Sequence, residues 1–433
     1  MKTVHLLYGR EGMELSVPDS AHVLTAHDAP PLPDPVDAIA RALEEPIGCA
    51  PLRQLITARR PRHVAVTVSD ITRHVPNRLF LPLILKTLNE CGVPDSSVVI
   101  IIGTGMHRPS TPSERETIVG PETLSRVEVV DHCASDPSTL VTISDDPPVR
   151  VCRRFAQADF RIVTGFVEPH FMAGFSGGRK GVCPALVDLA TVQRFHGYAT
   201  LADPRAESGV LEGNPCHEIA LGVARRVGVD FILNVTLTQD RRLAGVFAGH
   251  LEAAHTAACL EVREHAATVL PPYDLVVTCG GGHPLDQTFY QSVKGMCAAM
   301  PALSARTTLL QASLCAEAVG SPAYTELMLR YDNDWRRFLD DIAARPNQTL
   351  LDQWEYQMQC RVLGLIGMER LWFACDGIPI KTQRRLSVTP LPGPGGARQR
   401  AQRAIDAFIA QRPGARVAVI PTGPFTLLRA PHA

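Results

Sequence analysis

The sequence predicts an α/β protein with mainly parallel sheets. Short apolar runs alternate with helical stretches, and continuous apolar runs of this length are typical of strands buried on both faces of a parallel sheet. Each run ends in polar residues or glycines. The predicted strand segments are 63–70, 97–107, 159–170, 231–240 and 273–286. Helices are expected between them, for example over 79–91 and 216–227, and this alternation favours an α/β architecture.

The chain of 433 residues should form two or three domains, since a domain usually takes roughly 100–200 residues. A proline pair, Pro271–Pro272, precedes the strand segment 273–286. We therefore predict an N-terminal catalytic and cofactor-binding domain over 1–268 and a C-terminal α/β domain over 269–433. The first 18 residues alternate apolar and polar side chains around a glycine, which predicts a hairpin of the mature fold and not a signal peptide.

The overall composition excludes several classes of partner. The formal net charge is -1, which gives no reason to expect nucleic acid or a charged membrane surface. No apolar run approaches the length of a membrane span. The twelve cysteines never form a CxxC pair, which argues against structural zinc and a thioredoxin-type site. We expect a cytoplasmic protein whose thiols stay reduced.

The stretch "EPHFMAGFSGGRKGVCPAL", residues 168–186, follows a predicted strand and combines a histidine, adjacent glycines and a lysine. It does not fit the phosphate loop G-x-x-x-x-G-K-[ST], because the sixth residue from Gly174 is Arg179. Gly177 and Gly178 could still let backbone N–H groups approach an anion. The alternative is a plain glycine turn with Lys180 at the surface.

Other candidate residues also follow predicted strands, where ligands gather in open α/β sheets. We expect four separate strand tips to face one site. His107 is either a ligand-facing residue or a hydrogen-bonded structural histidine. Asp70 is either an N-cap with Thr72 in the first turn, or the neighbour of Arg73, whose planar fork holds a carboxylate.

Further along the chain, Gln291 and Lys294 lie three apart and should share one face of a helix, where the lysine is either solvated or functional. Trp354 is either a core residue or part of a site.

Five segments, taken together and in order, resemble the nickel-dependent lactate racemase family over most of the chain. They are "SDITRHVPN", "GTGMHRPST", "EPHFMAGFSGGRKGVCPAL", "FHGYAT" and "YQSVKG". The resemblance implies a two-domain α/β enzyme with its cofactor in the interdomain cleft. The implied cofactor is nickel held by a nickel-pincer nucleotide, pyridinium-3-thioamide-5-thiocarboxylic acid mononucleotide, covalently attached to Lys180.

Roles for individual residues follow from the same resemblance. Two opposing catalytic bases are implied at His107 and His170, and the nickel-binding imidazole at His196. The implied cofactor contacts are Asp70, Thr72, Ser176, Gly177, Gly178 and Lys180. The implied substrate contacts are Arg73, Tyr290, Gln291, Lys294 and Trp354. The sequence departs from the family pattern at Ala185 and Ala318, where glycine is usual.

The implied reaction is racemisation or epimerisation of a small, lactate-like 2-hydroxy acid. Hydride would pass reversibly to the pyridinium through a 2-keto acid, while a histidine takes the hydroxyl proton. The implied partners are the substrate and the proteins that make and insert the cofactor. Two alternatives remain open: a zinc-dependent hydrolase or lyase that uses the dispersed His107, His170 and His196, and a non-catalytic relative that binds a hydroxy acid or nucleotide.

Overall fold

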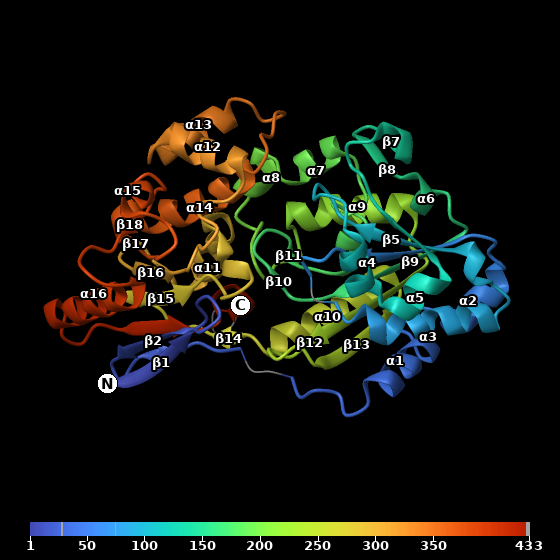
Figure 1. The fold of residues 1–433 in the computed structure, drawn as a ribbon, viewed down its shortest axis with the longest axis horizontal. Helices are drawn as coiled ribbons and strands as arrows, with labels where there is room; N and C mark the ends of the chain where they lie inside the picture. The colour runs from blue at the N-terminus through green and yellow to red at the C-terminus, as the bar shows by residue number, and fades with distance from the viewer. Residues whose placement is uncertain (27–28, 74, 430–433) are drawn as a thin grey trace. The chain divides into compact units, whose positions relative to one another are not determined.

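The computed structural model describes residues 1–26, 29–73 and 75–429 (Figure 1). The chain forms two compact units. The central unit comprises residues 28–195 and 209–264, and the terminal unit comprises residues 1–27, 196–208 and 265–433. The chain enters the terminal unit for the last time at residue 265, close to the predicted boundary at 269. Two earlier segments, however, also belong to that unit, so each unit is discontinuous in sequence.

The central unit is built on a six-stranded sheet of order β13-β12-β9-β4-β5-β6. All neighbouring pairs are parallel except β12 with β13. The strands are β4 (Val64–Ser69), β5 (Val98–Gly103), β6 (Glu128–Asp131), β9 (Phe160–Phe166), β12 (Phe231–Leu237) and β13 (Leu243–Gly249). Four of the five predicted strand segments are therefore neighbours in one sheet, and the α/β fold with mainly parallel sheets is confirmed.

Helices pack against this sheet because its strands are apolar on both faces. The buried core joins β4, β5 and β9 to three helices: α1 (Pro35–Glu44), α2 (Leu52–Arg59) and α3 (Asn77–Glu90). Helix α10 (Leu251–Glu264) contacts β12 and β13. The helices predicted over 79–91 and 216–227 are present as α3 and α9 (Pro215–Val227), and the Asn214 side chain caps α9.

Shorter elements complete the central unit. The helices are α4 (Pro112–Val119), α5 (Pro121–Arg126), α6 (Arg153–Ala156) and α7 (Leu189–Phe195). Two antiparallel pairs are β7 (Leu140–Asp145) with β8 (Pro148–Cys152), and β10 (Pro169–His170) with β11 (Gly174–Phe175). The β10–β11 pair carries part of the motif that stands out in the sequence.

The terminal unit contains a second six-stranded sheet, of order β18-β17-β16-β15-β19-β3, with every neighbouring pair parallel. Its strands are β3 (His22–Val23), β15 (Leu275–Cys279), β16 (Thr308–Ala312), β17 (Leu371–Ala374), β18 (Thr389–Pro390) and β19 (Val417–Ile420). The predicted N-terminal hairpin is confirmed as β1 (Lys2–Leu6) paired with β2 (Met13–Val17). The strand segment 273–286 thus belongs to a different sheet from the other four.

The helices of the terminal unit carry the second group of candidate residues. They are α8 (Tyr198–Ala202), α11 (Phe289–Ala298), α12 (Pro322–Tyr331), α13 (Trp335–Ala343), α14 (Gln353–Ile366), α15 (Ile380–Gln383) and α16 (Ala397–Gln411). A short parallel pair joins β14 (Ala267–Thr268) to β20 (Leu428–Arg429). Helix α16 packs on β2, and α11 packs on α14.

Two expectations from composition can be compared with the structure. Within the described ranges, no helix combines the length and the apolarity that a membrane crossing requires. All twelve cysteines are free thiols, and nine of them are buried, so they act as small core residues.

Candidate functional site

An aspartate and a histidine meet where two adjacent strands of the central sheet end. Asp70 follows β4 and His107 lies in the turn after β5, and the distance from His107 Nδ1 to Asp70 Oδ2 is 2.5 Å. The second carboxylate oxygen of Asp70 accepts hydrogen bonds from the backbone N–H and the hydroxyl of Thr72. Burial alone would raise the pKa of Asp70, but the hydrogen bonds from His107 and Thr72 hold it below its usual value. The carboxylate therefore stays ionised and orients an imidazole whose side chain is 62% exposed.

Arg73, near the Asp70–His107 pair in sequence, has a carboxylate partner of its own. Its guanidinium forms an ion pair with Glu168, which follows β9. The backbone of Glu168 is in turn joined to Ser176, since the Glu168 N–H donates to the Ser176 hydroxyl at 2.9 Å and its carbonyl accepts from the Ser176 N–H. Ser176 is 5% exposed and also donates to the Phe166 carbonyl. These contacts fix the predicted carboxylate-binding arginine to the glycine-rich turn.

The glycine-rich turn requires glycine at two consecutive positions. Gly177 has φ 73° and Gly178 has φ 51°, both in the left-handed region. A Cβ on Gly178 would lie 2.6 Å from the ring of His255 in α10. The N–H of Gly178 already donates to Asn234 Oδ1 of β12 at 2.8 Å. The expectation that Gly177 and Gly178 would both offer N–H groups to an anion is thus not met at Gly178.

Lys180 follows this turn and is partly buried. Its Nζ lies 3.3 Å from His170 Nε2 and 5.1 Å from the centre of the Phe195 ring. Burial, and then the positive charges of Arg73 and Arg179, lower the pKa of Lys180 to about 7. A substantial fraction of this amine is therefore uncharged and nucleophilic at neutral pH.

A second group of predicted residues gathers in the terminal unit. Trp354 on α14 donates from Nε1 to the Tyr290 hydroxyl on α11 at 2.8 Å. The Trp354 ring also lies 4.8 Å from the His196 ring, at an interplanar angle of 31°. Gln291 and Lys294 follow on the same helix as Tyr290, as predicted, and the buried Gln291 Oε1 has no hydrogen-bond partner among the described residues.

Ala185 and Ala318, which stand where glycine was expected, differ in backbone conformation. Ala318 has φ 62°, so this position does adopt the backbone that glycine favours. Its carbonyl accepts from the N–H of Phe289, the first residue of α11. Ala185, by contrast, does not have a positive φ, and its carbonyl accepts from the Gly105 N–H at 3.0 Å. Neither alanine displaces a predicted catalytic side chain.

No cluster of three or more metal-binding side chains occurs among the residues described by the structure. His107 and His170 instead make the separate contacts given above, within the central unit. His196 belongs to the terminal unit, where its ring lies in tilted contact with that of Trp354.

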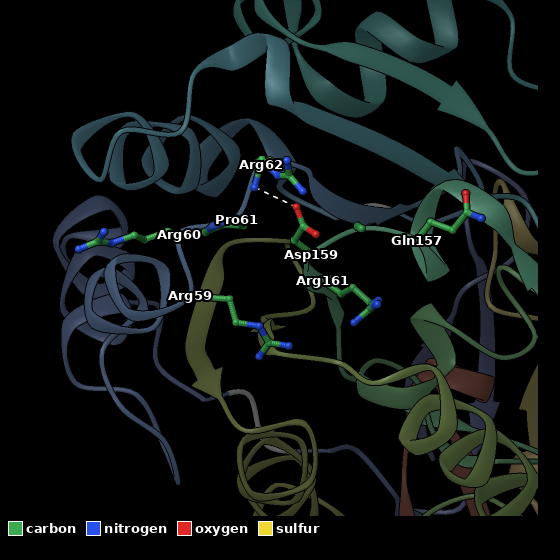
Figure 2. Close-up of a pocket in the computed structure, with 8 residues that line it drawn as sticks. Arg59, Arg60, Pro61, Arg62, Gln157, Asp159 and Arg161 are labelled. Atoms are coloured by element: carbon green, nitrogen blue, oxygen red, sulfur yellow. Dashed lines mark hydrogen bonds between the residues drawn. The ribbon is translucent and has the colours of Figure 1, made fainter.

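A polar cavity of about 560 Å³ lies elsewhere in the central unit (Figure 2). It is lined by residues at or near the starts of β4 and β9, and none of the predicted site residues lines it. Arg59 forms an ion pair with Asp230 at 3.0 Å, and the backbone N–H of Arg62 donates to Asp159 at 2.9 Å. We therefore place the candidate site at the carboxyl ends of the strands and not in this cavity.

Sequence reasoning missed three residues that hold the site together. Glu168 lies inside the motif of residues 168–186, but its partner Arg73 is distant in sequence, so no local pattern indicates its role. Asn234 is a polar residue inside an apolar strand, which is a detectable signal of a buried hydrogen bond. His255 gives no local signal, because only the packing of α10 under the turn places it against Gly178.

A Gly178→Ala substitution should destabilise the protein by more than about 1 kcal/mol, because alanine is strained at positive φ and its Cβ would meet His255. Gly222→Ala is the matched control: Gly222 lies inside α9, and nothing lies within 4 Å of its added Cβ. That control should gain up to about 1 kcal/mol. Urea unfolding of both variants measures the difference. Equal stabilities would show that the turn tolerates a side chain.

Comparison with known proteins gives the family. The sequence matches the lactate racemase N-terminal domain over residues 8–209 and the lactate racemase C-terminal domain over residues 270–369. The chain is 35% identical over 331 residues to a lactate racemase of Thermoanaerobacterium thermosaccharolyticum, covering 76% of this chain and 77% of that protein. It is 34% identical, with the same coverage, to a lactate racemase of Lactiplantibacillus plantarum.

Solved structures agree with this result. The lactate racemase apoprotein from T. thermosaccharolyticum superposes with a TM-score of 0.89 at 30% identity, covering 99% of this chain and 100% of that one. A Thermotoga maritima protein shares the fold at a TM-score of 0.65 and 16% identity, covering 94% of this chain and 100% of that one. The named relatives are racemases, and racemases are isomerases, which confirms the predicted enzyme class. The chain therefore belongs to the lactate racemase family.

Proposed function

We propose that this protein is a racemase or epimerase of a small, lactate-like 2-hydroxy acid. The observation that carries the proposal is the set of groups at the carboxyl ends of β4, β5 and β9: an oriented histidine, a guanidinium and a half-buried amine within one network. Lactate racemases among its relatives support the same reaction class.

His107 has the contacts of a general base. Asp70 accepts from Nδ1, which fixes the ring and stabilises the positive charge that develops when Nε2 takes a proton. Nε2 is then the atom that would accept the hydroxyl proton of the substrate. A positioned base of this kind contributes roughly 10²–10⁴ in rate. His170 is the proposed base for the opposite enantiomer.

Arg73 is the proposed anchor for the substrate carboxylate. The Nη1 atom of Arg73 is engaged by Glu168, and the remaining N–H groups of its planar fork suit a carboxylate. Glu168 also keeps the guanidinium from carrying an uncompensated charge while no substrate is bound. Gln291, Lys294 and Tyr290 of the terminal unit are the proposed contacts for the rest of the substrate.

The residues present fit the implied nickel-pincer nucleotide. Lys180 offers an amine of lowered pKa for covalent attachment, and no carboxylate forms an ion pair with it in the described part of the chain. Asp70, Thr72, Ser176, Gly177 and Gly178 are the proposed neighbours of the nucleotide. His196, whose ring lies against that of Trp354, is the proposed nickel ligand, since an imidazole suits Ni²⁺. When bound, the cofactor would supply a hydride acceptor for the C2 hydrogen of the substrate.

The decisive test is activity of the chain produced together with cofactor-synthesis proteins. We expect it to interconvert the D and L forms of at least one 2-hydroxy acid in a panel that includes lactate, measured by chiral chromatography. The C2 hydrogen should return without exchange with deuterated solvent. Rapid deuterium entry at C2 would support direct proton abstraction instead, and zinc-dependent hydrolysis or binding without turnover would support the other two candidate functions.

Lys180→Ala should abolish covalent attachment of the cofactor, because the substitution removes the amine. Intact mass of the protein, made in the presence of the cofactor-synthesis proteins, measures this directly. Lys86→Ala on α3 is the matched control and should carry the same adduct as the native chain. An adduct of unchanged mass on the Lys180→Ala protein would place the attachment elsewhere.

Arg73→Ala should weaken substrate binding by about 2–5 kcal/mol and so lower kcat/KM, since it removes the proposed ion-pair partner of the substrate carboxylate. Most of the change should be in KM. Arg126→Ala, which breaks an ion pair with Asp95 elsewhere in the central unit, controls for the loss of an arginine. Native KM in the Arg73→Ala protein would mean that another group holds the carboxylate.

A further inference from the structure

The two predicted bases have different hydrogen-bond partners at Nδ1. For His107 the partner is the Asp70 carboxylate, at 2.5 Å. An ionised carboxylate only accepts hydrogen bonds, so Nδ1 of His107 carries a proton. A neutral imidazole has one N–H, and Nε2 of His107 therefore has its lone pair available.

For His170 the partners are two backbone N–H groups. Nδ1 accepts from the Met172 N–H at 3.3 Å and from the Ala173 N–H at 3.2 Å. Because a backbone N–H can only donate, Nδ1 of His170 must present its lone pair. The single proton of the neutral ring is then on Nε2, the opposite of His107.

The turn that supplies these two N–H groups is held in place. It joins β10 to β11, which pair antiparallel between His170 and Gly174. The Ala173 carbonyl accepts from Arg179 at 2.7 Å. A rearrangement that freed Nδ1 of His170 would disturb these contacts as well.

We propose that His107 and His170 adopt opposite tautomers in the chain without its cofactor (the unloaded chain). The Nε2 atom of His107 can then accept a proton, whereas Nε2–H of His170 donates a hydrogen bond to the neutral amine of Lys180. In this hydrogen bond His170 acts as a positioning residue for the amine of Lys180. What the tautomers mean for His107 and His170 as catalytic bases rests on the proposed function. The tautomers themselves are a property of the protein without its cofactor.

The surroundings of Lys180 support this arrangement independently. An Nε2–H group can donate to Nζ only if Nζ has a lone pair, which requires the uncharged amine. Among the described residues, the groups that act most strongly on the charge of Nζ are the cations Arg73 and Arg179 and the thiols of Cys183 and Cys216, and His170 is its hydrogen-bond partner. The ring of Phe195 favours the ammonium form. Burial and the two guanidinium groups oppose it, and the pKa of Lys180 is lowered to about 7.

This tautomer means that His170 must first shift its ring proton before Nε2 can act as a base. Before it can take the hydroxyl proton of a substrate, its own proton must move from Nε2 to Nδ1. That move would place an N–H against the N–H groups of Met172 and Ala173 and would break both hydrogen bonds. His107 meets no such obstacle, because its Nδ1–H is already matched to Asp70.

The tautomers can be measured in the unloaded, ¹⁵N-histidine-labelled protein at pH 8 by long-range ¹H–¹⁵N correlation. His107→Gln and His170→Gln variants assign the signals. His132 is an internal reference, because its Nε2 lies 2.9 Å from the Val187 carbonyl, an obligatory acceptor. We expect His170 to give the same Nε2–H pattern as His132, and His107 to give the opposite one. Identical tautomers for His107 and His170 would overturn the proposal.

A second measurement remains informative if either histidine variant fails to fold. Acetic anhydride labels uncharged amines, so its rate as a function of pH, read by peptide mass spectrometry, reports the protonation of each lysine. Lys180 should reach half its maximal rate near pH 7, and the profile of the exposed Lys86 in the same sample is the comparison. Coincident profiles would mean that Lys180 is an ammonium ion and would contradict the hydrogen bond from His170. Neither experiment depends on racemase activity, so failure of this inference is distinguishable from failure of the proposed function.

Discussion

The parallel pairing of β4 with β5 on one side and β9 on the other is the constraint on which the site in the central unit depends. The register pairs Ser69, the last residue of β4, with Gly103, the last residue of β5. The chain therefore leaves both strands at the same level of the sheet, and Asp70 meets the turn that carries His107. On the other side, the segment after β9 returns to Arg73 through Glu168. Side chains distant in sequence become one network because parallel strands end at a common edge.

Near the same edge, the cations Arg73 and Arg179 act on the amine of Lys180. Arg179 is 1% exposed, and its guanidinium is hydrogen-bonded to the Ala173 carbonyl and to His255. With Lys180 next to it, protonating the amine would place a second cation in a poorly solvated region. Together with burial, this unfavourable charge lowers the pKa of Lys180 to about 7.

The two histidines illustrate how the backbone can decide chemistry. A carboxylate and a pair of backbone N–H groups impose opposite proton positions on the same kind of ring. In the cofactor-free chain the two rings are therefore not equivalent. The glycine turn contributes by carrying Lys180 to His170, which it can do only because Gly177 and Gly178 adopt positive φ next to Asn234 and His255.

The sequence alone determined the fold class, the strand segments and the family, because apolar runs and ordered motifs are local signals. It also predicted that Gln291 and Lys294 share a helix. Only the tertiary structure decided that the fifth strand segment belongs to a second sheet, that Glu168 pairs with Arg73, and that Gly178 donates to Asn234. These contacts join residues far apart in the chain, and their partners are set by strand order and register. No local pattern encodes which carboxylate or N–H group will face a given side chain, and that choice fixes the proton positions on His107 and His170.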